Sequence, residues 1–262
     1  MSLVNFYCPV CENKKFNTFQ KVFDDRYGES NVYNLAKCTK CCHVATYPRI
    51  SQKELGKLYK KYYPRKNISH KDVLKNFKSK KNFLKFFIIW FQGTYNQGQI
   101  HAKEGENVLD IGCGDCSSLL EIENQGAKSF GIEADENVLS ISKKLNLKVH
   151  IGSIEDNPFP GKSFDLIIMN QVIEHLPEPD KSLEIIKKRL SPGGRLLMNF
   201  PNKDSIWQRL TRTKWINWHI PYHLHHFNKR SFENMISKFQ LESVKDIKAK
   251  VANMLNSTTL LL

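Results

Sequence analysis

Residues 106–125 read ENVLDIGCGDCSSLLEIENQ, and this stretch decides the fold. The apolar run that ends at Ile111 predicts a buried strand, the two glycines that follow predict a tight turn, and Ser117 begins a predicted helix. A second strand is predicted at residues 128–133. From residue 105 to 250, short β-rich runs alternate with helical patterns, which indicates an α/β protein with a parallel sheet.

The acidic residues around this loop indicate which ligand it binds. Glu133 follows Gly114 by 19 residues, the distance at which an acid can accept hydrogen bonds from ribose hydroxyls. A dinucleotide site favours a third glycine where this chain has Ser117. Asp110, directly before the loop, would repel a pyrophosphate. We therefore expect an adenosyl ligand that carries positive charge and no phosphate, which describes S-adenosylmethionine.

Four segments together resemble the class I S-adenosylmethionine-dependent methyltransferases, over about residues 105–240. The resemblance implies a Rossmann-like class I methyltransferase sheet and an enzyme that transfers a methyl group. The four segments are VLDIGCGDCSSLLEI from residue 108, GIEADENVLSISKK from residue 131, GSIEDNPFPGKSFDLIIMNQVIEHLPEP from residue 152, and LSPGGRLLMNFPN from residue 190.

The resemblance also implies which residues hold the cofactor. Carried over by position, they are Asp110, Gly112 and Gly114 at the methionine end, Glu133 at the ribose, Ser153 and Ile154 at the adenine, and Asn170 beside the path of methyl transfer. Cys113 and Cys116 lie within the loop, and we interpret them as small packing residues.

A general base would assist methyl transfer to a hydroxyl, and histidine suits neutral pH. Glu174 and His175 follow the fourth predicted strand, and His223 belongs to a histidine cluster after the fifth. We predict that these three residues are catalytic. Tryptophans with interleaved cations, which would suit a sugar phosphate, precede or join the cluster. The cluster is His219, His223, His225 and His226, and the other residues are Trp207, Trp215, Trp218, Arg209, Arg212 and Lys214.

The first 50 residues hold five of the seven cysteines. Two C-x-x-C pairs, with Cys8 and Cys11 in one and Cys38 and Cys41 in the other, can present four thiolates to one structural zinc ion. Residues 16–23 and 31–36 read as a hairpin between the pairs. We predict a zinc ribbon over residues 1–50, in which Cys42 or His43 could substitute as a ligand.

Residues 51–104 predict a basic amphipathic helical segment between the ribbon and a catalytic domain at residues 105–262. Seven apolar residues fall on one helical face. The segment either caps the catalytic domain or lies on an anionic membrane surface. The face is formed by Val73, Leu74, Phe77, Leu84, Phe87, Ile88 and Phe91.

We find neither a signal sequence nor an apolar run long enough to span a membrane, and expect a protein that is cytoplasmic or peripheral to the inner face of the membrane. A ribbon joined to this catalytic domain and a histidine-rich segment resembles bacterial methyltransferases of surface-polysaccharide and deoxysugar pathways. The resemblance implies O-methylation of a nucleotide- or lipid-linked sugar or glycan precursor.

Two alternatives stay open. The net charge of +14 would suit a nucleic-acid substrate, such as ribosomal RNA, although the fourth strand ends Asn170-Gln-Val and lacks the N-P-P-Y pattern of enzymes that methylate base amines. The QVIEHL segment resembles quinone-pathway O-methyltransferases, whose first acid at this segment is replaced here by Gln171.

The C-terminal segment predicts an incomplete sheet. Residues 241–251 can form a sixth strand, but residues 252–262 offer no convincing seventh, so the last strand is expected to be missing or the edge unusual. An uncovered edge would favour a partner or a homodimer.

Overall fold

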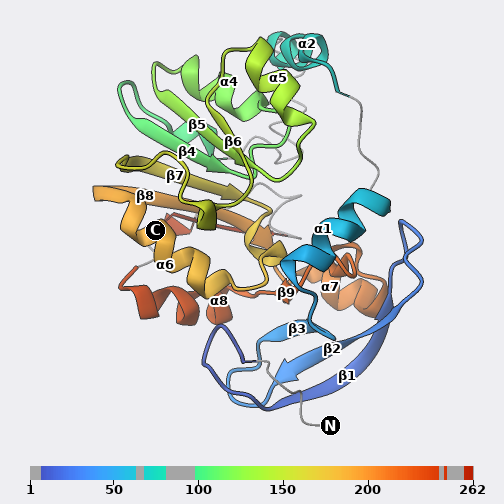
Figure 1. The fold of residues 1–262 in the computed structure, drawn as a ribbon. Coiled ribbons are helices and arrows are strands. Elements are labelled where there is room, and N and C mark those ends of the chain that lie inside the picture. The colour runs from blue at the N-terminus through green and yellow to red at the C-terminus, as the bar shows by residue number, and fades with distance from the viewer. Residues whose placement is uncertain (1–6, 63–67, 81–97, 242–244, 247–256, 262) are drawn as a thin grey trace.

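Five parallel strands form the centre of the molecule (Figure 1). The computed structural model describes residues 7–62, 68–80, 98–241, 245–246 and 257–261. The strands lie side by side in the order β8-β7-β4-β5-β6, which confirms the predicted α/β fold with a Rossmann-like parallel sheet. Their bounds are β4 (Asn107–Ile111), β5 (Lys128–Glu133), β6 (Val149–Ile151), β7 (Phe164–Asn170) and β8 (Leu190–Pro201).

Two antiparallel strands complete the β8 edge of this sheet. The strand β11 (Ser257–Leu261) pairs with β8, and the short β10 (Lys245–Asp246) pairs with β11. The expectation of a missing last strand is therefore wrong. The polar start of β11 concealed it, because its serine and two threonines give no apolar pattern, although threonine itself favours strands.

Helices cover both faces of the sheet, and alternate strand residues divide between the two sides. Val108 packs with one face cluster and Leu109 with the other, as expected for a strand buried on both faces. The helices of the first face are α2 (His70–Lys80), α4 (Ser117–Glu123) and α5 (Val138–Lys144), and those of the second are α6 (Pro179–Arg189) and α8 (Lys229–Ile236).

The N-terminal module is a hairpin followed by a third strand, and it continues into the catalytic part of the chain. The strands are β1 (Phe16–Phe23), β2 (Val32–Cys38), β3 (Val44–Tyr47) and β9 (His225–His226). They form a second sheet in this order. Because β9 belongs to the segment after β8, the two predicted domains share a sheet.

The segment between the two parts begins with α1 (Gln52–Lys61), whose first turn is closed by a capping box between Ser51 and Glu54. The apolar face of α2 is turned toward the protein, since Val73 is fully buried in a cluster with Leu119 and Val138. For residues 70–80 the structure thus supports a cap on the catalytic domain. Residues 81–97, which complete the predicted amphipathic helix, lie outside the described residues.

Across the part of the chain that the structure describes, no helix has the length and apolar character that crossing a membrane requires.

Candidate active site

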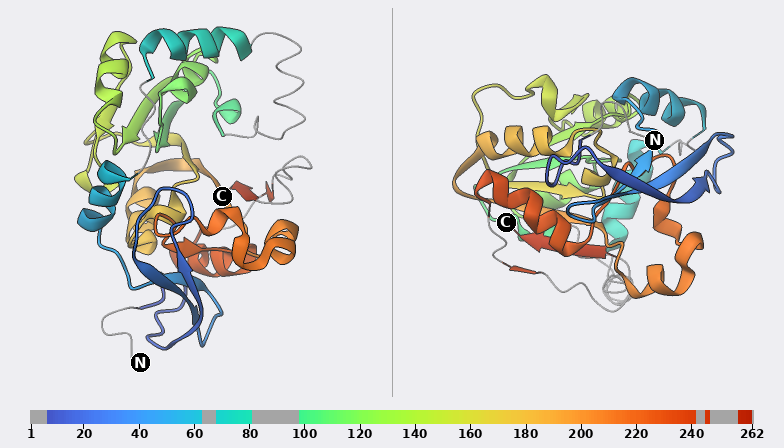
Figure 2. Two further views of the ribbon diagram at one scale, coloured as in Figure 1. Left: turned by 90° about the vertical axis from the view of Figure 1, so that its right-hand side faces the viewer. Right: turned by 90° about the horizontal axis from the view of Figure 1, so that it is seen from below.

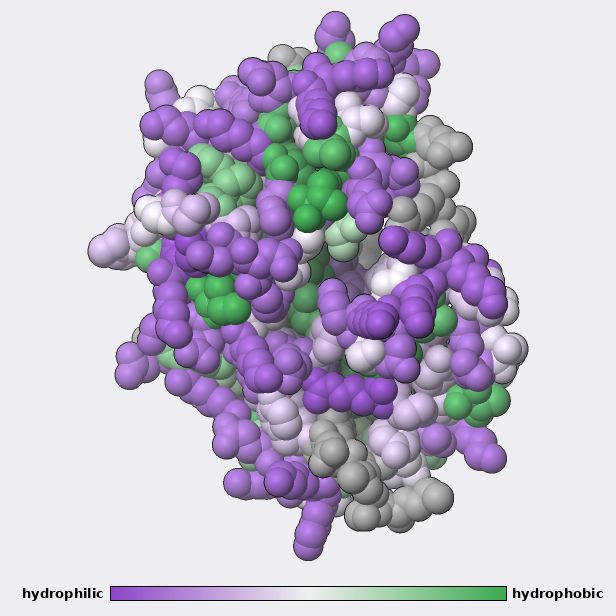
Figure 3. Space-filling model, viewed as in Figure 1, coloured by the Kyte–Doolittle hydropathy of each residue, from purple (hydrophilic) through white to green (hydrophobic). Residues whose placement is uncertain are grey.

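A cavity of about 1420 Å³ opens at the carboxyl ends of β4, β5 and β7. Figure 3 shows this side of the molecule hollowed between α1 and the part that carries α5. The lining includes six of the seven predicted cofactor residues and one predicted catalytic residue: Gly112, Gly114, Glu133, Ser153, Ile154, Asn170 and His175. Parallel strands end at one edge of the sheet, and this topology brings the residues together.

The two loop glycines are required for different reasons. Gly112 has φ +76°, and a Cβ on it would meet the Cγ2 of Val172 at 2.4 Å. Gly114 has φ +55° and faces open space, so a ligand can approach its backbone closely. Cys113 and Cys116 are buried in the core between the loop and α4, in agreement with their interpretation as packing residues.

Glu133 ends β5 and holds the loop across the cavity floor. One carboxylate oxygen accepts from the Gly114 amide at 2.9 Å, and the other accepts from the Asp135 amide at 3.0 Å. Each oxygen has a second lone pair, so the carboxylate can still accept from hydroxyl groups in the cavity.

Asp110 is the predicted cofactor residue that does not line the cavity. It is 4% exposed beneath the loop, where its carboxyl group accepts a hydrogen bond from the Ser118 hydroxyl. Burial raises the pKa of Asp110 to about 7, and the neighbouring Glu133 carboxylate adds to the shift. The Asp110 side chain thus supports the loop from beneath, through its contact with Ser118.

A turn after β6 carries Ser153 and Ile154, the two residues expected at the adenine, into the cavity lining. Ser153 caps a 3-10 helix at Ile154–Asp156, and the Ser153 amide donates to the Asp156 carboxylate at 2.7 Å. Ile154 is 2% exposed, so its side chain forms part of the core while its backbone borders the cavity.

His175 lies on the cavity wall with hydrogen-bond partners on one ring nitrogen. Its Nδ1 is 2.9 Å from the Tyr222 carbonyl oxygen and 2.9 Å from the Tyr59 hydroxyl. The carbonyl can only accept, so this contact favours the tautomer with the proton on Nδ1 and the lone pair on Nε2, whereas a hydrogen bond donated by the Tyr59 hydroxyl would require the opposite tautomer. Burial lowers the pKa of His175 to about 4, which keeps the imidazole neutral at pH 7. The unprotonated ring can accept a proton at pH 7, although its lowered pKa makes it a weaker base than an exposed histidine.

Glu174 and His223 do not line the cavity, although both are predicted catalytic residues. Glu174 is 1% exposed, and its carboxyl oxygens have no hydrogen-bond partner among the described residues. Its nearest basic group is His223 Nε2, at 4.0 Å. Burial raises the pKa of Glu174 to about 8 and lowers that of His223 well below its usual value. The two residues form a buried layer behind His175.

The other histidines of the cluster join the N-terminal module to the catalytic part instead of opening to substrate. His225 Nδ1 is 3.1 Å from His43 Nε2, and His226 Nε2 is 3.0 Å from the Thr46 hydroxyl. The same hydroxyl donates to the His223 carbonyl at 2.7 Å. The expected tryptophans and cations at residues 207–218 are also absent from the described cavity lining.

Two tyrosines that the sequence analysis missed complete the cavity wall. Tyr59 comes from α1, and Tyr27 from the loop of the β1–β2 hairpin. Tyr27 packs edge-on against His219 and Tyr222. The sequence offered one signal for each, an aromatic residue in the predicted hairpin of the zinc ribbon and another in the predicted helical segment.

The four predicted cysteine ligands meet at one point. Their sulfur atoms all lie within 4.8 Å of one another, with 3.5 Å between Cys8 and Cys41 and 3.6 Å between Cys11 and Cys38. Zinc–sulfur bonds of about 2.3 Å place tetrahedral sulfurs about 3.8 Å apart, so the cluster fits a zinc ion. Cys42 is exposed and His43 contacts His225, so neither belongs to the cluster.

Comparison with known proteins identifies the family. A model of the methyltransferase domain matches residues 94–246, which is more than half of the chain. The chain belongs to this methyltransferase family. This agrees with the methyltransferase domain that the sequence predicted.

Curated relatives match the chain over part of their own length. A protein of a Streptomyces fradiae transposon is 28% identical over 41% of this chain and 33% of the relative. A ubiquinone biosynthesis O-methyltransferase of Coxiella burnetii is 28% identical over 42% of this chain and 49% of the relative. The match thus spans half or less of these proteins.

Solved structures share the fold. One chain in the complex between the Haloferax volcanii Trm112 methyltransferase activator and a methyltransferase is 14% identical, with a TM-score of 0.53. The match covers 71% of this chain and 96% of that chain. At this identity the likeness concerns the fold alone.

Proposed function

We propose that the enzyme transfers a methyl group from S-adenosylmethionine to a hydroxyl group of a nucleotide- or lipid-linked sugar or glycan precursor. The observation that carries this proposal is His175, a neutral imidazole with a free Nε2 lone pair on the wall of the cavity that holds the glycine loop. A hydroxyl nucleophile needs such a base, whereas an amine or thiolate has less need of one.

The cavity fits the cofactor in shape and chemistry. The open backbone at Gly114 would receive the methionine end, and the Glu133 carboxylate would accept hydrogen bonds from the ribose. Ser153 and Ile154 would border the adenine, with Asn170 beside the transfer path. When bound, the cofactor supplies an activated methyl group on a sulfonium. The Glu133 carboxylate at the cavity floor favours this positive charge, while Asp110 supports the loop from beneath.

The acceptor side of the cavity suits a sugar ring. At about 1420 Å³ the cavity exceeds the volume of a typical small-molecule site, which leaves space for an acceptor beside the cofactor. Tyr27 and Tyr59 present aromatic surfaces and hydroxyl groups at its outer wall. His175 then takes the proton from the acceptor hydroxyl, and Tyr59 holds the imidazole in place through Nδ1.

We propose further that Cys8, Cys11, Cys38 and Cys41 hold a structural zinc ion. Four thiolates would close its coordination sphere, so the ion would support the module and take no part in the methyl transfer.

A screen with labelled S-adenosylmethionine tests the substrate class. Nucleotide sugars, lipid-linked glycans, catechol-type quinone precursors and ribosomal RNA are incubated separately with the full chain, and the product that carries label is identified. The proposal predicts label on a sugar oxygen. Label on RNA, or on a quinone precursor alone, would contradict it.

A quinone-type small-molecule acceptor is the second candidate, favoured by the match to a ubiquinone biosynthesis O-methyltransferase. It also needs a base at a hydroxyl group. Gln171 takes the place of the first acid of the quinone-pathway segment, and its side-chain amide donates to Asn199. This contact is structural, which is why we place the sugar acceptor first.

A further inference from the structure

The largest unexplained feature of the surface is an apolar patch on α7 (Ile206–Thr211) and the segment that follows it. Ile206, Trp207, Leu210 and Ile216 are 54%, 45%, 68% and 59% exposed. Single exposed apolar residues are ordinary, but four large ones within residues 206–216 mark an interaction site. Both views in Figure 2 place α7 at the periphery of the molecule.

The same segment is positively charged. Arg209, Arg212 and Lys214 are all exposed, and residues 205–216 contain no acidic residue. Apolar side chains interleaved with cations characterise helices that lie at the surface of an anionic membrane.

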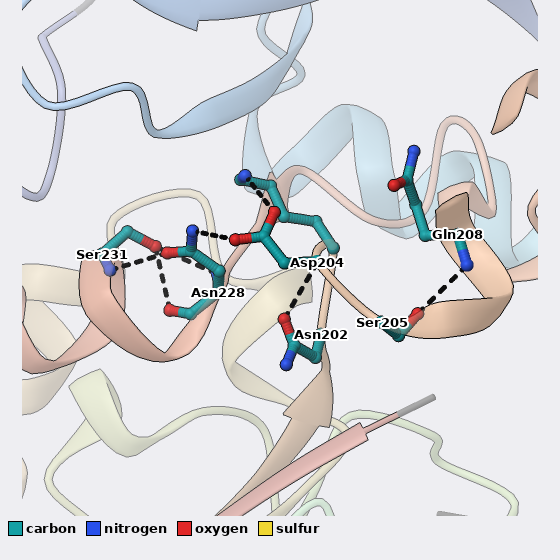
Figure 4. A network of polar contacts seen from close by, with 7 residues as sticks. Asn202, Asp204, Ser205, Gln208, Asn228 and Ser231 are labelled. Carbon is teal, nitrogen blue, oxygen red and sulfur yellow. Dashed lines mark hydrogen bonds and ion pairs between the residues drawn. The ribbon is translucent and has the colours of Figure 1, made fainter. Parts of the chain in front are cut away.

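A network of hydrogen bonds and one ion pair holds the start of α7 in place (Figure 4). Ser205 caps the helix by accepting from the Gln208 amide at 3.2 Å. The Asp204 carboxylate accepts from Asn228 at 2.6 Å and from Lys203 at 2.7 Å. Asn228 in turn caps α8, so the starts of the two helices are tied together.

A hollow of about 440 Å³ adjoins this segment and adds cations beside apolar surface. Its lining includes Phe19, which is 53% exposed, and the ion pair of Lys203 with Asp204, together with two further cations, Lys37 and Arg212. No ion pair with an acidic residue is described for either cation within the described residues. The hollow offers these charges to an anionic group such as a lipid phosphate.

Three kinds of occupant can be compared. RNA would suit the cations and could stack on Trp207 and Phe19, but a nucleic-acid strand would leave the aliphatic Ile206, Leu210 and Ile216 without an apolar partner. A second copy across a twofold axis would bring the same cations face to face, at an electrostatic cost. An anionic lipid surface accommodates both the apolar side chains and the charges. On α2, which is the described part of the other candidate for a membrane contact, Val73 is buried against the catalytic domain.

We propose that α7, residues 212–216 and the adjoining hollow, together called the α7 surface, bind the interface of an anionic membrane. The apolar side chains insert among the acyl chains, and the cations meet the lipid phosphates. This function goes beyond methyl transfer and does not depend on the acceptor, because lipid binding requires neither cofactor nor substrate.

The test is sedimentation of the full chain with vesicles of phosphatidylcholine alone or mixed with phosphatidylglycerol. We expect binding to the mixed vesicles only. The double variant Arg209→Glu/Lys214→Glu should weaken binding by at least about tenfold, since each cation near such a surface contributes on the order of 1 kcal/mol. Trp207→Ser/Leu210→Ser should weaken it similarly, and circular dichroism confirms that each variant is folded.

Matched controls locate the surface. Leu139→Ser removes a 40% exposed apolar residue from α5, and Lys71→Glu/Lys75→Glu reverses two exposed charges on α2. Both should bind mixed vesicles as the wild type does. The proposal is overturned if the wild type ignores the mixed vesicles, or if the α2 variant loses binding while the α7 variants keep it. It is also overturned if the α7 variants lose only RNA binding or self-association.

Discussion

At the scale of single residues, the partners of each histidine decide its role. The contact with the Tyr222 carbonyl favours the His175 tautomer with its proton on Nδ1 and with Nε2 available on the cavity wall. His223 has the same tautomer, because its Nδ1 is 2.8 Å from the Asn217 carbonyl, but it lies behind the wall. Sequence spacing placed both histidines near the strand ends and could not distinguish them, since access depends on side-chain direction.

We expect His175→Gln to lower the methyl-transfer rate by about 10²- to 10⁴-fold, the contribution typical of a general base. Calorimetry should show unchanged S-adenosylmethionine affinity. His101→Gln, which changes a partly exposed histidine that does not line the cavity, is the matched control. A wild-type rate in His175→Gln would remove this residue from the chemistry.

The pH dependence gives a separate test of the same base. Because burial lowers the pKa of His175 to about 4, the imidazole stays unprotonated, and therefore competent, from about pH 5 upward. The rate at saturating cofactor should be nearly flat between pH 5.5 and 7.5, whereas an ordinary histidine base would give an inflection near pH 6.5. Stopped assays in buffers of constant ionic strength measure the profile.

Glu174 makes a prediction about stability. Burial raises its pKa to about 8 from 4.5, so between these values the folded protein holds a proton that the unfolded chain releases. The contribution of protonated Glu174 to the free energy of unfolding is therefore fully present below about pH 4.5, and it is lost as the pH rises through 8.

Compared with wild type, Glu174→Gln should therefore gain stability as the pH rises from 5 to 8, by at most about 1.4 kcal/mol per unit. Urea unfolding at several pH values measures this gain. The neighbouring His223 stays neutral in this account. A difference that does not change with pH would show that Glu174 is ionised in the folded protein.

At the scale of elements, the pairing of β3 with β9 connects the cysteine module to the catalytic part. Val44 pairs with His226 and Ala45 with His225. The Thr46 amide donates to the Leu224 carbonyl, and the Leu224 amide donates to the carbonyl of Glu174. A continuous series of backbone contacts thus runs from the module to the residue before His175.

Thr46→Val should test this connection. The variant removes a hydroxyl that contacts both the His223 carbonyl and His226, and so leaves two buried groups without that partner. We expect the free energy of unfolding, measured with urea, to fall by about 1–3 kcal/mol. The methyl-transfer rate should fall by a larger factor than the affinity for S-adenosylmethionine. Thr18→Val, at an exposed position of β1, is the control. Equal effects from the two variants would contradict a specific role for the junction.

At the scale of the whole molecule, the sequence predicted what depends on local pattern. The glycine loop, the strand at residues 128–133 and the four meeting cysteines were all readable from spacing. The sequence could not show that Tyr27 and Tyr59 reach the cavity, since both lie on elements that are far from the glycine loop in the sequence. It also misplaced His225 and His226, because their partners, His43 and Thr46, belong to the N-terminal module.

If the cysteine cluster holds zinc, metal removal should affect more than the module. Elemental analysis of protein purified under reducing conditions should find one zinc per chain, and Cys11→Ser should lose it. Because β3 and β9 share a sheet, the variant should also have a lower melting temperature and a lower methyl-transfer rate. Cys42→Ser is the matched control, since this exposed cysteine lies outside the cluster. Metal-free wild-type protein would contradict the zinc proposal.

The central claim is that the cavity beside Gly114 and Glu133 binds S-adenosylmethionine, and calorimetry tests it most directly. The account predicts one site per chain, and about 2 kcal/mol or more of lost affinity in Glu133→Ala, which removes hydrogen bonds to a charged acceptor. Glu104→Ala, at an exposed acid away from the cavity, should bind normally. Absent binding by the wild-type chain, or equal affinity in Glu133→Ala, would contradict the account.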